Sequence, residues 1–167
     1  HVYMGSYLWD HDLTKQTLQK VGEIAKAQKI ETSLSLSDPF CVDRHRDELK
    51  KFVEEYIDIV FCNFDEAKMF CQCESMADVS AYLQNFSKKI VMTAGPEGAY
   101  YFEGETVVHE VALKVDNVID TTGAGDNFAA GFLDFYLSDK SIQEALTQGN
   151  SRASQVIQQL GPRIKRH

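Results

Sequence analysis

The sequence lacks a long hydrophobic run and an excess of positive charge. No apolar stretch approaches the roughly 18 residues of a membrane-spanning helix, and the first residues lack the charged-then-apolar layout of a signal peptide. With 17 Lys and Arg against 25 Asp and Glu, the formal net charge of the 167 residues is −8, so nucleic acid or an anionic membrane would be repelled. We therefore expect a cytoplasmic protein that acts on a small molecule, without nucleic acid or membrane partners.

Cysteine is also sparse, and its arrangement argues against disulfides and metal centres. The four cysteines, Cys41, Cys62, Cys71 and Cys73, lie within or beside apolar runs, which predicts reduced and mostly buried thiols. The last two form only a C-x-C pair, with no nearby histidine to complete a zinc site.

The composition, 44% hydrophobic and 25% charged residues, is typical of one globular domain with a core. Apolar residues recur at helical spacing over residues 12–29, 44–56, 65–70 and 77–86. Asp12 or Thr14 is available to cap the first of these helices. Strand-like runs lie at residues 1–8, 32–36, 57–62 and 90–93. Short strands that alternate with helices predict a parallel sheet covered on both faces.

The pattern changes after Gly95. Residues 99–102 and 106–111, joined through residues 103–105, predict a hairpin, and helices are expected over 124–137 and 142–160, before Gly161-Pro162. There is no internal repeat. The predicted fold class is α/β: a three-layer sandwich in which a mainly parallel sheet, with an antiparallel edge, is flanked by helices.

The sharpest feature of the sequence is DTTGAGDNF, residues 120–128. It lies between the strand-like residues 115–119 and a helix expected to begin near Gly125. Gly123, Ala124 and Gly125 are small enough for their N–H groups to approach an anion closely, and the helix dipole adds partial positive charge there. This loop therefore predicts phosphate binding.

Asp126 follows in the expected first turn of the helix. A carboxylate beside a bound phosphate can orient an acceptor hydroxyl and accept its proton, which is the usual protein contribution to activating the nucleophile in phosphoryl transfer. The alternative is a tight helix start in which Asp126 is only the cap. The loop is neither G-x-x-x-x-G-K-[ST] nor G-x-G-x-x-G, so the Walker and Rossmann classes lack their required residues.

Residues 120–132, DTTGAGDNFAAGF, resemble the C-terminal signature of the ribokinase-like (PfkB-type) family of sugar and nucleoside kinases. The resemblance implies a ribokinase-like fold and ATP as the phosphoryl donor. It also implies that Asp126 is the catalytic base and that Gly123, Ala124 and Gly125 form an anion hole. The chemistry expected from the residues themselves agrees with this assignment.

Weaker motifs follow in the order of the family. Asn63-Phe64-Asp65-Glu66 matches its N-x-x-E element. This match implies that Glu66 holds Mg²⁺ through water and that Asn63 is part of the nucleotide-binding site. Taken alone, Glu66 would be a surface helix residue. Thr93, Gly95 and Gly98 match its T-x-G-x-x-G turn near the nucleotide phosphates and ribose. The alternative for these three residues is a glycine turn that leads into the hairpin.

Three further matches concern the nucleotide base, a cation and the acceptor. Asn150 matches a family position beside the adenine, and Asp120 and Thr122 match positions where the family often binds a monovalent cation, so the resemblance implies a K⁺ site there. A structural role for Asp120 is the alternative. Residues 35–40, SLSDPF, are similar to a segment of adenosine-kinase-like members, which favours a nucleoside acceptor. The same residues would also suit a turn that ends a strand.

The resemblance covers nearly the whole chain but only the C-terminal half of the family fold. The N-terminal part, with the lid and the residues that grip the acceptor, is not found in the sequence. We expect residues 1–167 to be the nucleotide-binding and catalytic portion of a larger kinase domain, with little activity alone; the alternative is a short relative completed by a partner chain. A sugar kinase and a non-catalytic nucleotide-binding module are the alternative functions, and a homodimer is left open.

Overall fold

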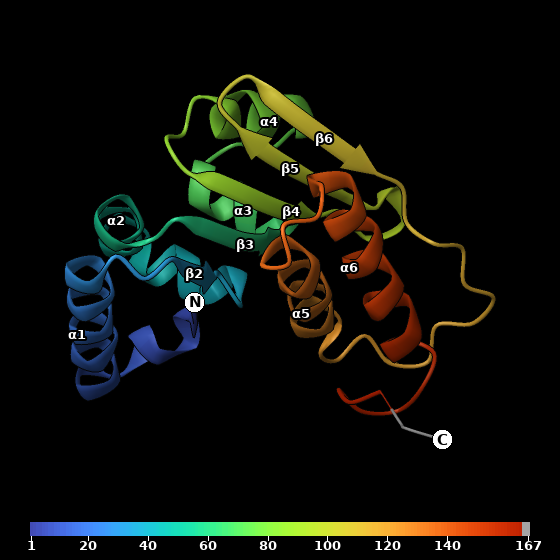
Figure 1. Ribbon diagram of the computed structural model, residues 1–167, viewed down its shortest axis with the longest axis horizontal. Coiled ribbons are helices and arrows are strands. Elements are labelled where there is room, and N and C mark those ends of the chain that lie inside the picture. Colours follow the sequence, from blue (N-terminus) through green and yellow to red (C-terminus); the bar gives the residue numbers. More distant parts are fainter. Residues whose placement is uncertain (165–167) are drawn as a thin grey trace. The chain divides into compact units, whose positions relative to one another are not determined.

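The computed structural model describes residues 1–164. The chain divides into two compact units: unit 1 comprises His1–Met92 and Phe102–Val107, and unit 2 comprises Thr93–Tyr101 and the described residues from 108 onward. Six strands form one sheet in the order β1-β2-β3-β4-β5-β6 (Figure 1). The sheet is mixed and flanked by helices, so the predicted α/β class is confirmed.

Unit 1 alternates strands with helices along the chain. Its strands are β1 (Val2–Gly5), β2 (Thr32–Ser35), β3 (Ile59–Asn63) and β4 (Lys89–Thr93). Its helices are α1 (Asp12–Gln28), α2 (Pro39–Tyr56), α3 (Phe64–Cys71) and α4 (Met76–Gln84). The pairs β1/β2 and β2/β3 are parallel, as the helical crossovers between these strands require.

The core of unit 1 follows from the strand register. Met4 lies opposite Leu34, which lies opposite Val60, and all three side chains are buried. Consecutive strands therefore bring one apolar row to the same face of the sheet, where burial removes it from water. All four cysteines also lie in this unit; Cys41, Cys62 and Cys71 are buried, as predicted, and Cys73 is half-buried.

Three boundaries in unit 1 differ from the sequence expectation. The first strand ends at Gly5 rather than residue 8, because Ser6–Asp10 form a 3₁₀ helix. Neither Asp12 nor Thr14 caps α1; the Thr14 hydroxyl instead donates to the carbonyls of Leu8 and His11. Helix α2 begins at Pro39 rather than residue 44.

The early start of α2 has a local cause. The Asp38 carboxylate accepts a hydrogen bond from the Cys41 N–H at 2.9 Å, and Pro39 occupies the first helical position. Asp at the N-cap followed by Pro is a helix-start pattern. The Asp-Pro pair therefore begins a helix, in addition to ending the segment after β2.

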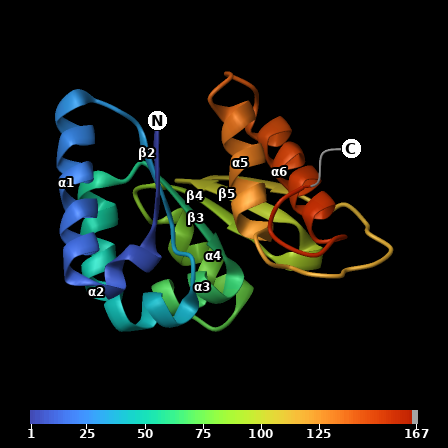
Figure 2. The ribbon, with the colours of Figure 1, turned by 90° about the horizontal axis from the view of Figure 1, so that it is seen from below.

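Unit 2 contains two packed helices, α5 (Ala124–Tyr136) and α6 (Ile142–Val156). They lie side by side in both views (Figure 1 and Figure 2). Gly149 permits this approach, because a Cβ there would lie 2.7 Å from the Phe128 ring. Phe132 of α5 is buried and stacks on Tyr101 of β5 (Ala99–Glu103).

The predicted hairpin is present as β5 and β6 (Thr106–Glu110), joined by residues 104 and 105. Two other expectations for unit 2 are wrong. Residues 115–119 form no strand; the N–H of Ile119 donates to Ile157 at the end of α6 instead, and Val118 and Ile119 are about half exposed. Helix α6 ends at Val156 rather than residue 160, and Gly161 adopts a left-handed φ of 88°.

No helix within residues 1–164 combines the length and the apolar character needed to cross a membrane.

Candidate functional site

A cavity of about 650 Å³ lies within unit 2. Six of the residues singled out in the sequence line it: Thr93, Gly95, Gly98, Ala124, Gly125 and Asn150. Its walls are mainly apolar, and its volume lies in the range of small-molecule sites, which is roughly 300–1,000 Å³. The structure therefore brings the glycine turn, the start of α5 and Asn150 together around one space.

The start of α5 leaves two backbone donors open. Gly123 is the N-cap, with a left-handed φ of 75°, and no side chain caps the helix. The Ala124 N–H donates to the Thr121 carbonyl at 3.1 Å, but within residues 1–164 the N–H groups of Gly125 and Asp126 meet no acceptor. Open N–H groups at the positive end of a helix dipole favour an anion.

Asp126 lies in the same first turn, directly after the cavity residue Gly125, and its side chain is exposed. It does not cap the helix, so the capping alternative is not what the geometry shows. A carboxylate at this position stands next to the two open N–H groups. The arrangement can hold an anion and, beside it, a hydrogen-bond acceptor for a hydroxyl.

Asp120 organises the loop before α5. One carboxylate oxygen accepts the Thr122 N–H and the other accepts the Gly161 N–H, both at 2.9 Å. Hydrogen bonds from the Thr122 side chain and from these two N–H groups lower the pKa of Asp120 below its usual value. Both oxygens are thus accounted for by loop structure, as the structural alternative for Asp120 expects.

The turn between β4 and β5 requires glycine at Gly98. This residue has a φ of 100°, and a Cβ there would lie 2.0 Å from the Glu110 carbonyl oxygen. The Ala94 N–H donates to the Gly98 carbonyl at 2.8 Å and closes the turn. Gly98 thus lets the chain pass close to the end of β6 while the turn also lines the cavity.

Asn150 is buried on α6, with 7% of its surface exposed. Its Nδ2 donates to the carbonyls of Glu110 and Val111, both at 3.1 Å. The amide therefore holds the start of the segment 111–120, several residues of which line the cavity.

Asn63 and Glu66 belong to unit 1 and do not line this cavity. They form a capping box at the start of α3. The Asn63 Oδ1 accepts the Glu66 N–H at 2.8 Å, and the Glu66 carboxylate accepts the Asn63 N–H at 3.0 Å and the Asn63 Nδ2 at 2.8 Å. Glu66 is only 5% exposed, so it is not the surface residue that the motif taken alone would suggest.

Burial raises the pKa of Glu66 to about 7. The hydrogen bond from the Asn63 backbone opposes this shift, and the negative charges of Asp38 and Asp65 add to it. The Glu66 anion is therefore poorly stabilised by the residues around it, and a cation nearby would relieve that cost.

Sequence reasoning missed most of the apolar wall of the cavity. Phe128 of α5 and Ala153, Ser154 and Ile157 at the end of α6 contribute to it. The signal was present, because residues 150, 153 and 157 share one face at helical spacing. Val118 was assigned to a strand and is instead a wall residue on an irregular segment.

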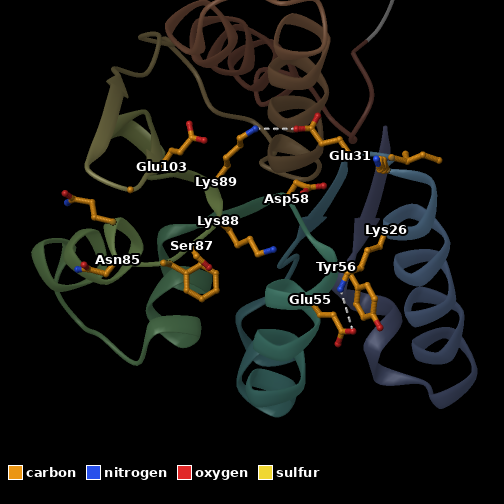
Figure 3. Close-up of a pocket in the computed structure, with 15 residues that line it drawn as sticks. Lys26, Glu31, Glu55, Tyr56, Asp58, Asn85, Ser87, Lys88, Lys89 and Glu103 are labelled. Carbon is orange, nitrogen blue, oxygen red and sulfur yellow. Dashed lines mark hydrogen bonds and ion pairs between the residues drawn. The ribbon is translucent and has the colours of Figure 1, made fainter.

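A larger cavity of about 820 Å³ lies in unit 1 (Figure 3). Its charges compensate one another: Lys89 pairs with Glu31 at 3.5 Å and Lys26 with Glu55 at 3.9 Å. It lies where β2, β3 and β4 begin. Ligands of parallel α/β sheets bind beyond the other, carboxyl ends of the strands, so size alone does not make this cavity the functional site.

Comparison with known proteins identifies the family. Residues 1–166 match the model of the pfkB family of carbohydrate kinases. The chain belongs to this family. The pfkB signature found in the sequence is the segment that builds the start of α5.

Relatives with established names include nucleoside kinases. A cytidine kinase of Thermococcus kodakarensis is 32% identical over 120 residues, which are 71% of this chain and 43% of that protein. Adenosine kinase 2 of Arabidopsis thaliana is 28% identical over 163 residues, 89% of this chain and 47% of that protein. The chain thus spans less than half the length of these relatives.

Among solved structures, the adenosine kinase of Sinorhizobium meliloti superposes with a TM-score of 0.93 and 38% identity. The match covers 97% of this chain and 50% of that one. Nearly all of the chain therefore has the fold of one half of this adenosine kinase.

Proposed function

We propose that this pfkB chain contains the ATP-binding and catalytic part of a kinase that phosphorylates a hydroxyl of a nucleoside. The supporting observation is the pair of open N–H groups, on Gly125 and Asp126, at the edge of an apolar cavity. An apolar cavity suits a nucleobase, and donors at a helix start suit the phosphates attached to it. ATP contains both parts.

Each group of the site has a distinct task. The N–H groups of Gly125 and Asp126 stabilise negative charge on the phosphoryl group during transfer, because they are already fixed when the charge develops. The Asp126 carboxylate orients the acceptor hydroxyl and accepts its proton. The oxygen of that hydroxyl then forms the new bond to phosphorus, and the bond between the γ-phosphorus and the bridging oxygen of ATP breaks.

The residues at the start of α3 are suited to bind a Mg²⁺ ion through water molecules. Glu66 is a buried carboxylate whose charge is poorly compensated, and it adjoins the exposed amide of Asn63. Mg²⁺ retains several waters and uses few protein ligands, so one carboxylate and one amide are adequate. Bound there, the ion would supply positive charge beside the Glu66 carboxylate.

A monovalent cation such as K⁺ finds less support. Hydrogen bonds from Thr122 and Gly161 to its two oxygens lower the pKa of Asp120, so its charge, unlike that of Glu66, is stabilised without a metal. We therefore assign Asp120 to loop structure and derive no step of the reaction from a K⁺ ion.

A nucleoside acceptor is supported by the names of several relatives, a cytidine kinase and adenosine kinases, although others are named 2-dehydro-3-deoxygluconokinase. The segment 35–40 adds nothing further, because its geometry is that of a turn and a helix cap at Asp38. The second candidate is a sugar kinase, which the carbohydrate-kinase description of the family favours.

The relatives contain about as much chain again as the part they share with this one. We propose that this further half supplies the lid and the acceptor-binding residues, from the same chain or from a partner chain. The 167 residues by themselves are then expected to bind ATP and to turn over slowly.

The test is an assay of ATP-dependent phosphorylation with the whole gene product, on a panel of nucleosides and of sugars such as ribose and fructose. The proposal expects turnover with a nucleoside and little with free sugars. Turnover with sugars alone would select the second candidate, and ATP binding without any phosphorylation would leave a nucleotide-binding module. The 167-residue chain, assayed beside it, tests the need for the further half; full turnover by this chain would contradict that need.

A further inference from the structure

The segment after α6, residues 157–163, lies against the loop that precedes α5. The Ile157 carbonyl accepts the N–H groups of Ile119 and Asp120, at 2.8 and 3.3 Å. Further along, the Gly161 N–H donates to the Asp120 carboxylate at 2.9 Å. The end of the described chain is therefore fastened to the loop that precedes α5.

Asn127 makes the contact closest to the helix start. Its Nδ2 donates to the Gly123 carbonyl at 2.8 Å and to the Pro162 carbonyl at 2.9 Å. Its own N–H also donates to the Gly123 carbonyl, at 3.0 Å. Because an amide Nδ2 carries two hydrogens, one for each carbonyl, this side chain bridges the helix start and the segment 157–163.

The bridge fixes one peptide plane. The Gly123 carbonyl is held by two donors of Asn127, and the N–H at the other end of the same peptide, on Ala124, donates to Thr121. The peptide between Gly123 and Ala124 therefore cannot rotate without breaking these bonds. The next two N–H groups along the chain are the open ones of Gly125 and Asp126, whose directions depend on this plane.

The contact is also close-packed. A Cβ on Gly123 would lie 2.6 Å from the Cβ of Pro162, so the segment touches the signature loop without intervening space. Helix formation alone does not need this arrangement: α3 is capped by Asn63 within its own first turn, whereas Asn127 reaches a residue 35 positions away.

We propose that Asn127 is a positioning residue for phosphoryl transfer: by tying residues 157–163 to the Gly123–Ala124 peptide, it holds the open N–H groups in place for the phosphate. The proposal rests on the proposed function of this site. Asn127 acts through the backbone in this proposal, because both hydrogens of its amide are used within the chain.

Two variants of the whole gene product test the role. Asn127→Ala removes both side-chain bonds. Asn127→Ser keeps a hydroxyl that can donate to the carbonyl four residues earlier in a helix, here Gly123, but is too short to reach Pro162. The matched control is Gln155→Ala, an exposed carboxamide on α6 that bonds only to Ser151 of its own helix.

Two measurements separate positioning from the function itself. Hydrogen exchange of the Gly161 amide reports whether the segment remains fastened, with or without kinase activity. Steady-state kinetics with ATP report the effect on transfer, and a displacement of catalytic groups by an ångström can cost about 100-fold.

For both Asn127 variants we expect faster exchange at Gly161 and a kcat at least about 10-fold below that of the control, with a smaller change in the acceptor KM. Unchanged exchange at Gly161, or wild-type kcat in Asn127→Ser, would overturn the proposal. If the wild-type protein phosphorylates nothing, the proposed function fails, while the exchange data still decide whether Asn127 fastens the segment.

Discussion

The starts of α3 and α5 both have a carboxylate at the third helical position, Glu66 and Asp126, but they differ in whether their backbone N–H groups find acceptors. At α3, the side chains of Asn63 and Glu66 satisfy each other's N–H groups. At α5, the N-cap is Gly123, which has no side chain, and the N–H groups of Gly125 and Asp126 meet no acceptor among the described residues. We call the start of α3 closed, because side chains satisfy its N–H groups, and the start of α5 open, because two of its N–H groups have no acceptor among the described residues.

The difference shows where a ligand is needed to complete the structure. Helices α4 and α6 are closed as well, by Ser75 and by the Ser141–Glu144 capping box. An unsatisfied helix start costs free energy unless water, a side chain or a ligand binds it. The open start at the edge of the cavity is therefore the position where an anion has most to contribute.

The largest effect is expected at the open start. Asp126→Asn retains the size of the side chain and removes the base, so kcat should fall by about 10²–10⁴-fold while the affinity for ATP is retained. The matched control is Asp78→Asn, which changes the residue at the same position of the closed start of α4. It should leave kcat unchanged. Steady-state kinetics and calorimetry of ATP binding measure both; wild-type turnover in Asp126→Asn would remove the base assignment.

The second prediction concerns the pH dependence of the closed start at α3. The pKa of Glu66 is about 7 in the fold, above the usual 4.5, so the folded protein binds this proton more tightly than the unfolded chain does. The resulting stabilisation is fully present below pH 4.5 and is lost as the pH rises through 7. The free energy of unfolding should lose up to about 3 kcal/mol from this group.

Denaturant unfolding between pH 5 and 8, with a chelator present, measures this loss. Glu66→Gln has no proton to lose and serves as the reference. The difference in stability between the two proteins should change in favour of the variant as the pH rises. A difference that is constant with pH would show that Glu66 titrates normally.

The third prediction compares two caps. Asn63→Ala should lower the free energy of unfolding by about 2 kcal/mol, at the upper end of the range for N-caps, because it also leaves the buried Glu66 with fewer partners. Ser75→Ala removes the exposed cap of α4 and should cost about 1 kcal/mol. Thermal or chemical denaturation measures both. An equal loss of unfolding free energy in the two variants would mean that the burial of Glu66 adds nothing to the contribution of the Asn63 cap.

The smallest effect is expected at Gly125. A Cβ at this position meets no atom within 4 Å, so Gly125→Ala should fold with an unchanged or slightly higher Tm. The added methyl group would stand beside the open N–H groups and weaken binding of an ATP analogue by about 10-fold, since glycine is what permits close approach.

Gly104→Ala is the control for this substitution, because Gly104 has a φ of 57° in the β5–β6 turn and lies outside the unit 2 cavity. It should lower stability by about 1 kcal/mol and leave binding unchanged. Calorimetric titration and thermal melts distinguish the two variants. Wild-type affinity in Gly125→Ala would show that the phosphate does not approach this residue.

Much of the fold could be predicted because its signals are local. The alternation of strands and helices in unit 1 and the β5–β6 hairpin are present close to their predicted bounds. The failures have local causes too. Val118 and Ile119 are apolar and β-branched, which favours a strand, but their segment pairs with the end of α6 rather than with a strand.

The candidate site likewise has one part that the sequence predicts and another that depends on the fold. The sequence by itself determined the candidate phosphate loop at residues 123–126, because small residues before a helix and a carboxylate in its first turn form a short local motif. Only the tertiary structure decided that Glu66 is buried, that Asn150 and Asp120 hold neighbouring segments, and that Asn127 reaches Pro162. Burial and long-range hydrogen bonds depend on which segments meet in space, and no local pattern specifies that.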